Sequence, residues 1–344
     1  MAYGLVINDI KQYKDRGLVI MSLFLSVLGT VFMDVKGFPF QAYEAKNRNL
    51  GNVQFVHGGV GRNIAENLGR AGCPTAFVSV LETTGMGPDV ENRLKAANVS
   101  TDYSHYTKHG GMGMWMVILD ETGELQGSIS QMPDLKQMEQ LIKDRGEEIV
   151  QASSHIITEL DLNHEIISHI TSLAKKHNKP IYGLPANMEI VLEHPELLHE
   201  FDCFVCNNYE ADKIFGIDFT NMEIAGQLAV LTDYMKHSGL QQMVITLGEK
   251  GSVFYDKKTG AKGHQPVFPV NLVDCSGAGD AYFSGIVMGL STGLTLQEAV
   301  ICGTRVAGWT IESTESICPD LMEKIEQNQE MHDLLFRHKL VGQA

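Results

Sequence analysis

The segment Val273-Asp274-Cys275-Ser276-Gly277-Ala278-Gly279-Asp280 continues directly into the apolar stretch Ala281-Tyr282-Phe283-Ser284-Gly285-Ile286-Val287. Small residues before an apolar stretch predict a turn that opens a helix, where the amides and the helix dipole favour an anion. The carboxylate of Asp280 follows the turn immediately. A proton acceptor beside an anion site suits phosphoryl transfer, which needs a base for an alcohol and stabilisation of phosphoryl charge. On this segment alone, an ordinary glycine-rich turn before a helix remains the alternative.

A second glycine motif, His57-Gly58-Gly59-Val60-Gly61-Arg62-Asn63-Ile64-Ala65-Glu66-Asn67-Leu68-Gly69-Arg70-Ala71-Gly72, lies far upstream. Its apolar residues recur at helical spacing, so the glycines are expected to open another helix. Together the two motifs resemble the signatures of the ribokinase-like (PfkB) family of sugar and nucleoside kinases. Those signatures are a Gly-Gly-x-Gly-x-Asn turn and a later Asp-Thr-Thr-Gly-Ala-Gly-Asp-like segment, and the resemblance covers about residues 22–320.

Other nucleotide-binding motifs do not fit the chain. No Gly-x-x-x-x-Gly-Lys-Ser/Thr sequence occurs, which excludes a P-loop enzyme. The first glycine motif has Ile64 where the third glycine of a dinucleotide-binding fingerprint would stand. Phosphate handling is therefore assigned to residues 277–280.

Alternating apolar runs and helical patterns predict β-α-β units with a mostly parallel central sheet and helices on both faces. The family resemblance implies the same fold class, a ribokinase-like three-layer α/β/α arrangement with a small β lid. We expect one kinase domain over residues 21–325, with lid strands from about 36–57 and 110–131 and a C-terminal helix or tail over 326–344. The lid segment includes a hairpin of Gly113 to Asp120 with Leu125 to Ser130. The expected strands of the central sheet are Leu23 to Val31, Thr75 to Val80, Ser154 to Thr158, Pro180 to Leu184, Asp202 to Cys206 and Met243 to Leu247.

Composition narrows the class of protein. A chain of 344 residues that is 44% hydrophobic can bury a large core. The formal net charge of −15 argues against a nucleic-acid partner, because the phosphates would be repelled. The six cysteines form no disulfide framework, which favours a reducing, cytoplasmic compartment.

The N-terminal stretch needs a separate interpretation. Leu18 to Met33 is almost wholly apolar, but it is short for a membrane span, lacks a small-residue cleavage site and is followed by Asp34. We interpret it as the first buried strand preceded by a leader over residues 1–20, and Met21 is a candidate for the natural start.

The resemblance assigns roles on the acceptor side. It implies that Asp280 is the general base and that the amides of Gly277, Ala278 and Gly279 stabilise charge on the phosphoryl group. The family's positions for gripping sugar hydroxyls are matched by Asp34 and Asn63, with close backbone approach at Gly58 and Gly59. For Asp34 the alternative is a solvated carboxylate at a strand end.

On the nucleotide side, Asn207-Asn208-Tyr209-Glu210 resembles the family's Asn-x-x-Glu element near the triphosphate, where Glu210 would hold Mg²⁺ through water. A helix N-cap is the alternative for this element. The run Thr246-Leu247-Gly248-Glu249-Lys250-Gly251 resembles the family's turn beside the nucleotide, which makes Thr246, Gly248 and Gly251 candidate contacts. Asp274 and the carbonyl of Ser276 fall where relatives bind a monovalent cation, although Cys275 and Ser276 replace two threonines of the family pattern.

The resulting hypothesis is an enzyme that uses ATP and Mg²⁺, with K⁺ dependence left open, to phosphorylate a primary hydroxyl of a sugar or nucleoside. The first glycine motif and the run Ile118-Leu119-Asp120-Glu121-Thr122-Gly123-Glu124 resemble pseudouridine kinases most, with ribose and adenosine-like nucleosides as alternatives. A sugar sensor that retains the fold without catalysis is the rival from another class. We expect a small-molecule partner, no nucleic acid and no membrane, and a homodimer through the β lid is left open.

Overall fold

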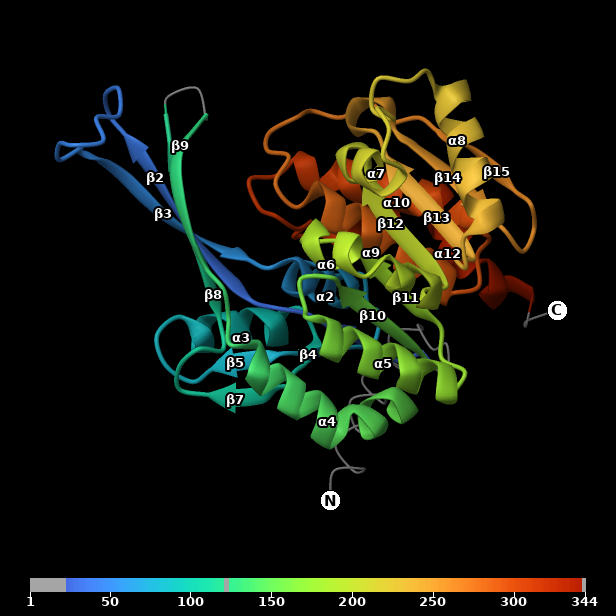
Figure 1. Cartoon of the computed structure of the whole chain (residues 1–344), viewed down its shortest axis with the longest axis horizontal. Coiled ribbons are helices and arrows are strands. Elements are labelled where there is room, and N and C mark those ends of the chain that lie inside the picture. The colour runs from blue at the N-terminus through green and yellow to red at the C-terminus, as the bar shows by residue number, and fades with distance from the viewer. Residues whose placement is uncertain (1–22, 121–123, 342–344) are drawn as a thin grey trace.

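The computed structural model describes residues 23–120 and 124–341. The leader and the proposed start at Met21 lie outside the described residues. Within the described part, a nine-stranded sheet has the order β15-β14-β13-β12-β11-β10-β1-β4-β6, and Figure 1 shows its helices in front and behind. The strands are parallel except for the two antiparallel pairings β13–β14 and β14–β15 at one edge. The predicted fold class, three layers with a mostly parallel sheet, is confirmed.

Six strands of this sheet match the short apolar runs predicted from the sequence, because a parallel sheet covered on both faces needs side chains that are buried on both faces. All four residues of β1 (Leu25–Leu28) are buried, and it lies centrally, between β10 and β4. The remaining strands are β4 (Thr75–Val78), β6 (Val99–Ser100), β10 (His155–Glu159), β11 (Ile181–Leu184), β12 (Cys203–Asn207), β13 (Gln242–Thr246), β14 (Ser252–Asp256) and β15 (Lys262–Gln265).

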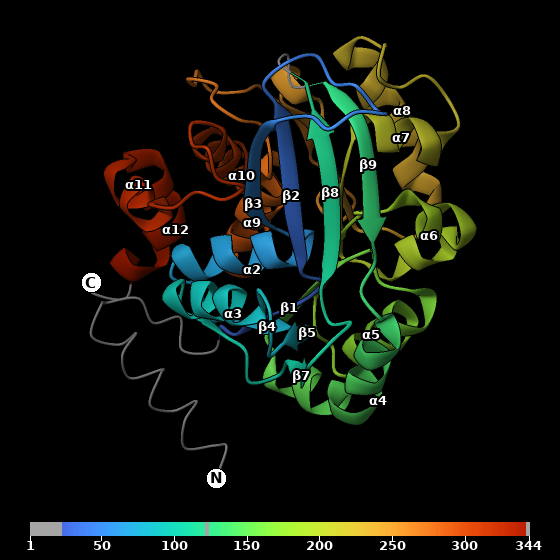
Figure 2. The same ribbon diagram turned by 90° about the vertical axis from the view of Figure 1, so that its left-hand side faces the viewer.

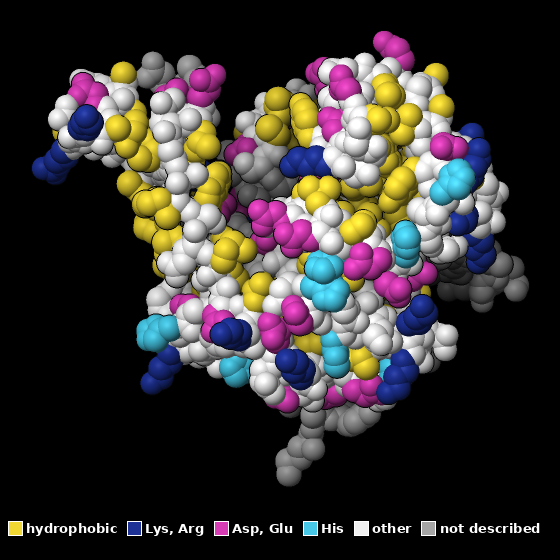
Figure 3. Space-filling model, viewed as in Figure 1, with side chains coloured by type: hydrophobic (Ala, Val, Ile, Leu, Met, Phe, Trp, Pro, Cys, Tyr) yellow, Lys and Arg dark blue, Asp and Glu magenta, His cyan; other side chains and the backbone are white. Residues whose placement is uncertain are grey.

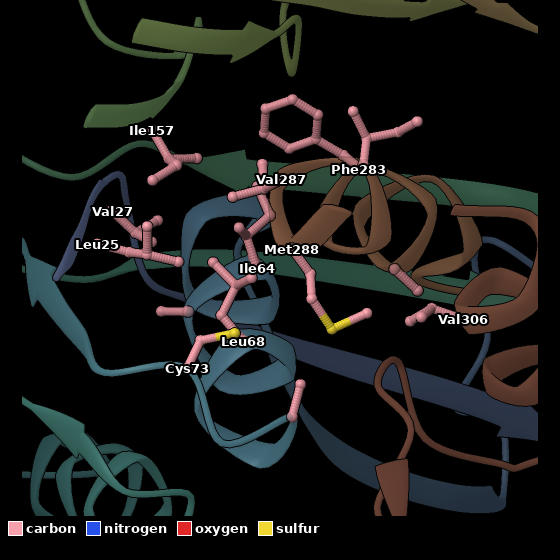
Figure 4. Close-up of a cluster of buried hydrophobic side chains, with 14 of the residues drawn as sticks. Leu25, Val27, Ile64, Leu68, Cys73, Ile157, Phe283, Val287, Met288 and Val306 are labelled. Atoms are coloured by element: carbon pink, nitrogen blue, oxygen red, sulfur yellow. The ribbon is translucent and has the colours of Figure 1, made fainter. Parts of the chain in front are cut away.

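Two hydrophobic clusters hold the helices to the two faces of the sheet. One face is covered by α2 (Val60–Arg70), α3 (Gly87–Ala96), α9 (Ala278–Ser291), α10 (Leu296–Ile311), α11 (Leu321–Gln327) and α12 (Gln329–Val341). In Figure 4, Ile64 and Leu68 of α2 meet Val287 of α9 beside Val27 of the sheet. The other face is covered by α4 (Leu135–Ala152), α5 (His164–Lys176), α6 (Met188–Glu193), α7 (Asn208–Phe215) and α8 (Ile224–His237).

A separate four-stranded sheet rises from one side of the body and forms the lid (Figures 1 and 2). Its order is β3 (Gly51–Gly58), β2 (Phe32–Pro39), β8 (Gly113–Leu119) and β9 (Leu125–Gln131). The predicted hairpin is confirmed, since β8 and β9 pair antiparallel. A further short pair joins β5 (Val80–Glu82) and β7 (His105–Thr107) below the lid.

The connections place the glycine motifs between lid and body. Strand β2 follows β1 after three residues, and β3 leads through Gly59 into α2. Helix α9 begins at the second motif and packs on α2. Ligands of open α/β sheets bind at the carboxyl ends of parallel strands, and the motifs and the lid lie at that edge. Among the described residues, no helix has the length and apolarity needed to cross a bilayer.

Candidate functional site

The first turn of α9 is set by glycine and is open on one side. Gly277 has φ of 74°, and a Cβ atom there would lie 2.0 Å from the carbonyl oxygen of Ser316, so only glycine fits this position. A Cβ atom added at Gly279 would meet nothing within 4 Å, so there is open space beside the backbone of the first helical turn. The Ala278 amide donates a long bond of 3.3 Å to the Cys275 carbonyl, so it is partly engaged. Open space before a helix N-terminus fits a phosphate group.

The first glycine motif reaches the same point from the other side. Gly59 has φ of 94° and is the N-cap of α2, and Asn63 lies in the first turns of that helix. Asn63 is 5% exposed, and its side chain donates from Nδ2 to Oδ2 of Asp280 at 2.6 Å. The two motifs, 217 residues apart in sequence, therefore meet side chain to side chain.

The surroundings of Asp280 suit a proton acceptor. Burial raises the pKa of its carboxyl to about 7, against the opposing effects of the Asn63 hydrogen bond and the positive charge of Arg62. The residue as a whole is nevertheless only partly buried. A carboxylate whose pKa lies near neutral pH can both accept a proton and release it.

Asp34 lies on the lid strand β2 and turns toward the glycine motif. A Cβ atom at Gly58 would lie 2.6 Å from Oδ1 of Asp34, so glycine leaves the space that this carboxylate occupies. Burial raises the pKa of Asp34, while Lys36 and Arg62 act to lower it. The arrangement places two carboxylates, Asp34 and Asp280, around the turn that contains Gly58 and Asn63.

A buried ionic network supports this turn, and the sequence motifs did not reveal it. Arg62 is 1% exposed and pairs with Glu66, which is fully buried and also binds Arg70 at 2.9 Å and Arg93 at 2.8 Å. Arg62 donates further to the His57 carbonyl and to Oδ1 of Asn63. The guanidinium thus orients the Asn63 amide so that its NH₂ group points to Asp280. The only sequence signal for this network is that Arg62, Glu66 and Arg70 follow one another at four-residue intervals in the helix.

Glu159, at the end of β10, is a second buried carboxyl that sequence reasoning missed. It accepts hydrogen bonds from the Thr30 amide at 2.5 Å, the Thr30 hydroxyl at 2.6 Å and the Gly61 amide at 2.5 Å. Burial raises its pKa to about 8, and these hydrogen bonds act in the opposite direction. Glu159 therefore ties the β1–β2 connection to the start of α2.

The Asn-x-x-Glu element forms the cap that the sequence left as an alternative. Asn207 is the N-cap of α7; its Oδ1 accepts from the Glu210 amide at 2.9 Å, and Oε2 of Glu210 accepts from the Asn207 amide at 2.7 Å. One Glu210 oxygen is thus engaged in a capping box. Burial raises the pKa of Glu210. A cap does not exclude a role toward Mg²⁺, and that role stays a prediction.

The other predicted residues lie at the same edge of the sheet. Thr246 ends β13, and Gly248 and Gly251 form the tight turn that follows, both with positive φ. Oδ1 of Asp274 accepts from the Ser276 amide at 2.8 Å, which helps to lower the pKa of Asp274 although burial acts to raise it. These contacts shape the loop before α9, and the cation site there stays a prediction. A cavity of about 370 Å³ lies elsewhere, beside Pro180, Asp202 and Gly239 near the amino ends of the strands, away from the glycine motifs.

Comparisons with known proteins identify the family and the fold. The family model described as "pfkB family carbohydrate kinase" matches residues 22–321. The guanosine-inosine kinase of Exiguobacterium acetylicum is 30% identical, over 88% of this chain and 99% of that protein. The pseudouridine kinase of Escherichia coli (strain K12) is 23% identical, over 87% and 93%. Among solved structures, Arabidopsis thaliana ribokinase complexed with ribose and ATP aligns with a TM-score of 0.76 at 20% identity, covering 92% of this chain and 99% of that one.

Proposed function

Because the chain belongs to the pfkB family of carbohydrate kinases, a family of phosphotransferases that act on alcohol groups, we propose that it phosphorylates the primary hydroxyl of a nucleoside at the expense of ATP. The observation that supports this most is the contact between Asn63 and Asp280 beside the open first turn of α9. This contact joins the proposed proton acceptor to the glycine motif that lies beside Asp34, next to the proposed anion site.

Each group of site residues has one role in the proposed mechanism. Asp34 and the turn with Gly58 and Gly59 hold the acceptor hydroxyls that do not react, since a buried carboxylate binds hydroxyls strongly. Asp280 takes the proton of the reacting hydroxyl, and Asn63 holds its carboxylate in place. The amides at Gly277, Ala278 and Gly279 stabilise the negative charge that develops on the phosphoryl oxygens.

The donor side is proposed from the same edge of the sheet. The turn with Thr246, Gly248 and Gly251 would border the nucleotide, and Glu210 with Asn207 would hold Mg²⁺, directly or through water. That ion would supply charge neutralisation on the phosphates. Oxygen ligands at a strand end suit it. A monovalent cation such as K⁺ would lie at Asp274 and the Ser276 carbonyl, next to the first turn of α9.

Among acceptors we place purine nucleosides first, because the relative at 30% identity is a guanosine-inosine kinase. We place pseudouridine second, because the sequence motifs resemble those of pseudouridine kinases and a second relative is a pseudouridine kinase. Ribose comes third. A sensor without catalysis is disfavoured, because Asp280 and the glycines around it are all retained.

An acceptor screen tests the proposal. The purified protein is incubated with Mg-ATP and guanosine, inosine, pseudouridine or ribose, ADP release is followed, and the product is identified as a 5′-phosphate. We expect turnover with at least one nucleoside at a higher kcat/KM than with ribose. Turnover with sugars alone would make the protein a sugar kinase, and binding without turnover would favour the sensor.

We propose also that two copies associate through the outer face of the lid. Phe55, Val35, Met116 and Ile129 form one cross-strand row on the face opposite Asp34. Phe55 is 60% exposed and Ile129 is 65% exposed. Figure 3 shows hydrophobic side chains gathered along the lid. An apolar surface of this kind favours an interface. Sedimentation of the wild type as a dimer and of Ile129→Lys as a monomer would support it.

A further inference from the structure

The lid places an aromatic side chain beside the carboxylate that is proposed to hold the acceptor. Strands β2 and β8 are parallel neighbours, and their register sets Asp34 opposite Trp115. Residues directly opposite each other on neighbouring strands point to the same face, with the backbones about 5 Å apart. On the other side of Asp34, the register of β3 sets Val56 in the same row. The carboxylate is therefore flanked by two apolar side chains.

This row faces the candidate site. Asp34 occupies the space beside Gly58, at the entry to α2. Lys36, two residues further along β2 and on the same face, lies near enough to Asp274 to act on the pKa of that carboxyl. Asp274 precedes the first turn of α9, so the face with Asp34, Lys36 and Trp115 looks toward the phosphate side. Figure 3 shows the hollow between the lid and the body.

Trp115 differs from its neighbours on β8 in its surroundings. The adjacent Met114 and Met116 point to the outer face and are each 44% exposed. Trp115 is partly buried and presents the largest flat apolar surface of its row. A half-buried indole on the inner face, next to a carboxylate, forms an amphipathic surface with one polar and one apolar part.

From this arrangement we infer that Trp115 is the residue that selects a nucleoside over a free sugar, by stacking on the base while Asp34 binds the ribose hydroxyls. In a nucleoside the base is attached to the carbon next to the one that carries the 2′-hydroxyl. A hydroxyl held by Asp34 therefore brings the base within one strand spacing of the carboxylate, where the indole lies. A free pentose has only a hydroxyl at that position, which leaves the ring in contact with water. The inference rests on the proposed function and adds its specificity-determining residue.

Stacking selects strongly between nucleosides and free sugars and only weakly between individual bases. Every nucleobase has a π face, so an aromatic platform discriminates weakly between bases and strongly against a ligand that has none. Purines, with two fused rings, cover more of an indole than pyrimidines do. The order guanosine or inosine, then pseudouridine, then ribose follows from the overlap area alone.

Kinetics of lid variants test the inference. We expect Trp115→Ala to lower kcat/KM for the preferred nucleoside about 10- to 100-fold, the range that loss of one base–aromatic stack produces. The same variant should leave kcat/KM for ribose within about threefold, because no base is lost. Trp115→Phe should restore most of the nucleoside activity, since it keeps an aromatic face. Met114→Ala, which changes the neighbouring residue on the opposite face, is the matched control and should retain wild-type values.

A binding measurement gives a second readout that does not depend on turnover. Trp309, in α10, is the other tryptophan of the chain, so Trp309→Phe leaves Trp115 as the sole indole. Guanosine and pseudouridine should then quench the fluorescence, and ribose should not. Nucleoside turnover that Trp115→Ala leaves unchanged, or nucleoside binding without quenching, would overturn the role of Trp115 alone. Phosphorylation of ribose with neither binding nor turnover of any nucleoside would overturn the proposed function together with this inference.

Discussion

Removal of the buried carboxylate of Glu66 tests whether the ionic network behind the site is essential to the fold. Glu66 is fully buried and binds Arg62, Arg70 and Arg93, and Arg62 is itself 1% exposed. Glu66→Gln keeps the shape of the side chain but leaves the buried Arg62 charge without an anionic partner. Breaking a buried pair in this way costs about 3–5 kcal/mol of the free energy of unfolding.

Urea unfolding of wild type and variant at pH 7 measures that free energy. The control is Glu148→Gln, because Glu148 binds Arg145 at 3.0 Å with its side chain 54% exposed, and such surface pairs contribute about 0–1 kcal/mol. The reasoning is refuted if Glu66→Gln is no more destabilised than Glu148→Gln.

The pH dependence of the same difference gives a second check. Burial acts to raise the pKa of Glu66, but the three arginines together hold it below its ordinary value of 4.5. A carboxyl with a lowered folded pKa stabilises the protein above the unfolded pKa and loses that contribution as the pH falls through the folded value. The gap between wild type and Glu66→Gln should therefore be largest above pH 4.5 and narrow below it.

Three further predictions concern the site itself. Asp34→Ala should weaken acceptor binding by about 1.5–3 kcal/mol, the contribution of hydrogen bonds to a charged group, and leave nucleotide affinity unchanged. If calorimetry finds the acceptor affinity unaltered, Asp34 is a solvated carboxylate at a strand end and does not bind the acceptor. Gly279→Ala should keep stability or raise it by up to about 1 kcal/mol, because the added Cβ atom meets nothing within 4 Å, yet it should weaken nucleotide binding by filling that open space. Gly277→Ala should instead destabilise the fold, because residue 277 has φ of 74° and its Cβ atom would clash with Ser316. Undiminished nucleotide affinity in Gly279→Ala would show that this turn is not part of the phosphate site. Because burial raises the pKa of Asp280 to about 7 and only the ionised form accepts a proton, kcat/KM should fall about tenfold per pH unit below that value and level off above it; a flat profile across the same range contradicts the assignment.

Much of the fold could be predicted from local sequence patterns. The strands near residues 154–158, 180–184 and 202–206 are short apolar runs, and each forms a strand of the central sheet within a residue or two of the expected limits. The hairpin of β8 and β9 was predicted from the turn between two extended segments, and β1 lies inside the apolar stretch that could have been taken for a membrane span. Hydrophobic periodicity and turn residues are local signals, so they predict strands and turns without knowledge of the tertiary structure.

The candidate site was only partly predictable, because its contacts are non-local. The glycine motifs identified Asn63 and Asp280 as candidate site residues, but nothing in the sequence showed that their side chains are in contact. Glu159 and the Arg62–Glu66 pair looked like ordinary polar residues, and only burial gives them a role. Met114 and Met116 lie on the outer face of the lid and are each 44% exposed, which the sequence did not indicate. Side chains alternate between the two faces of a lid strand, but the sequence does not show which of these faces lies toward the central sheet and its helices.

The turnover number of Asp280→Asn tests the central claim, that Asp280 is the proton acceptor, most directly. Asparagine has the same shape and can still meet Asn63, but it cannot take a proton. With the acceptor found in the screen, kcat should fall by about 10²-fold or more, while circular dichroism and nucleotide affinity match the wild type. A kcat close to that of the wild type, in a folded variant that binds nucleotide normally, would contradict the account.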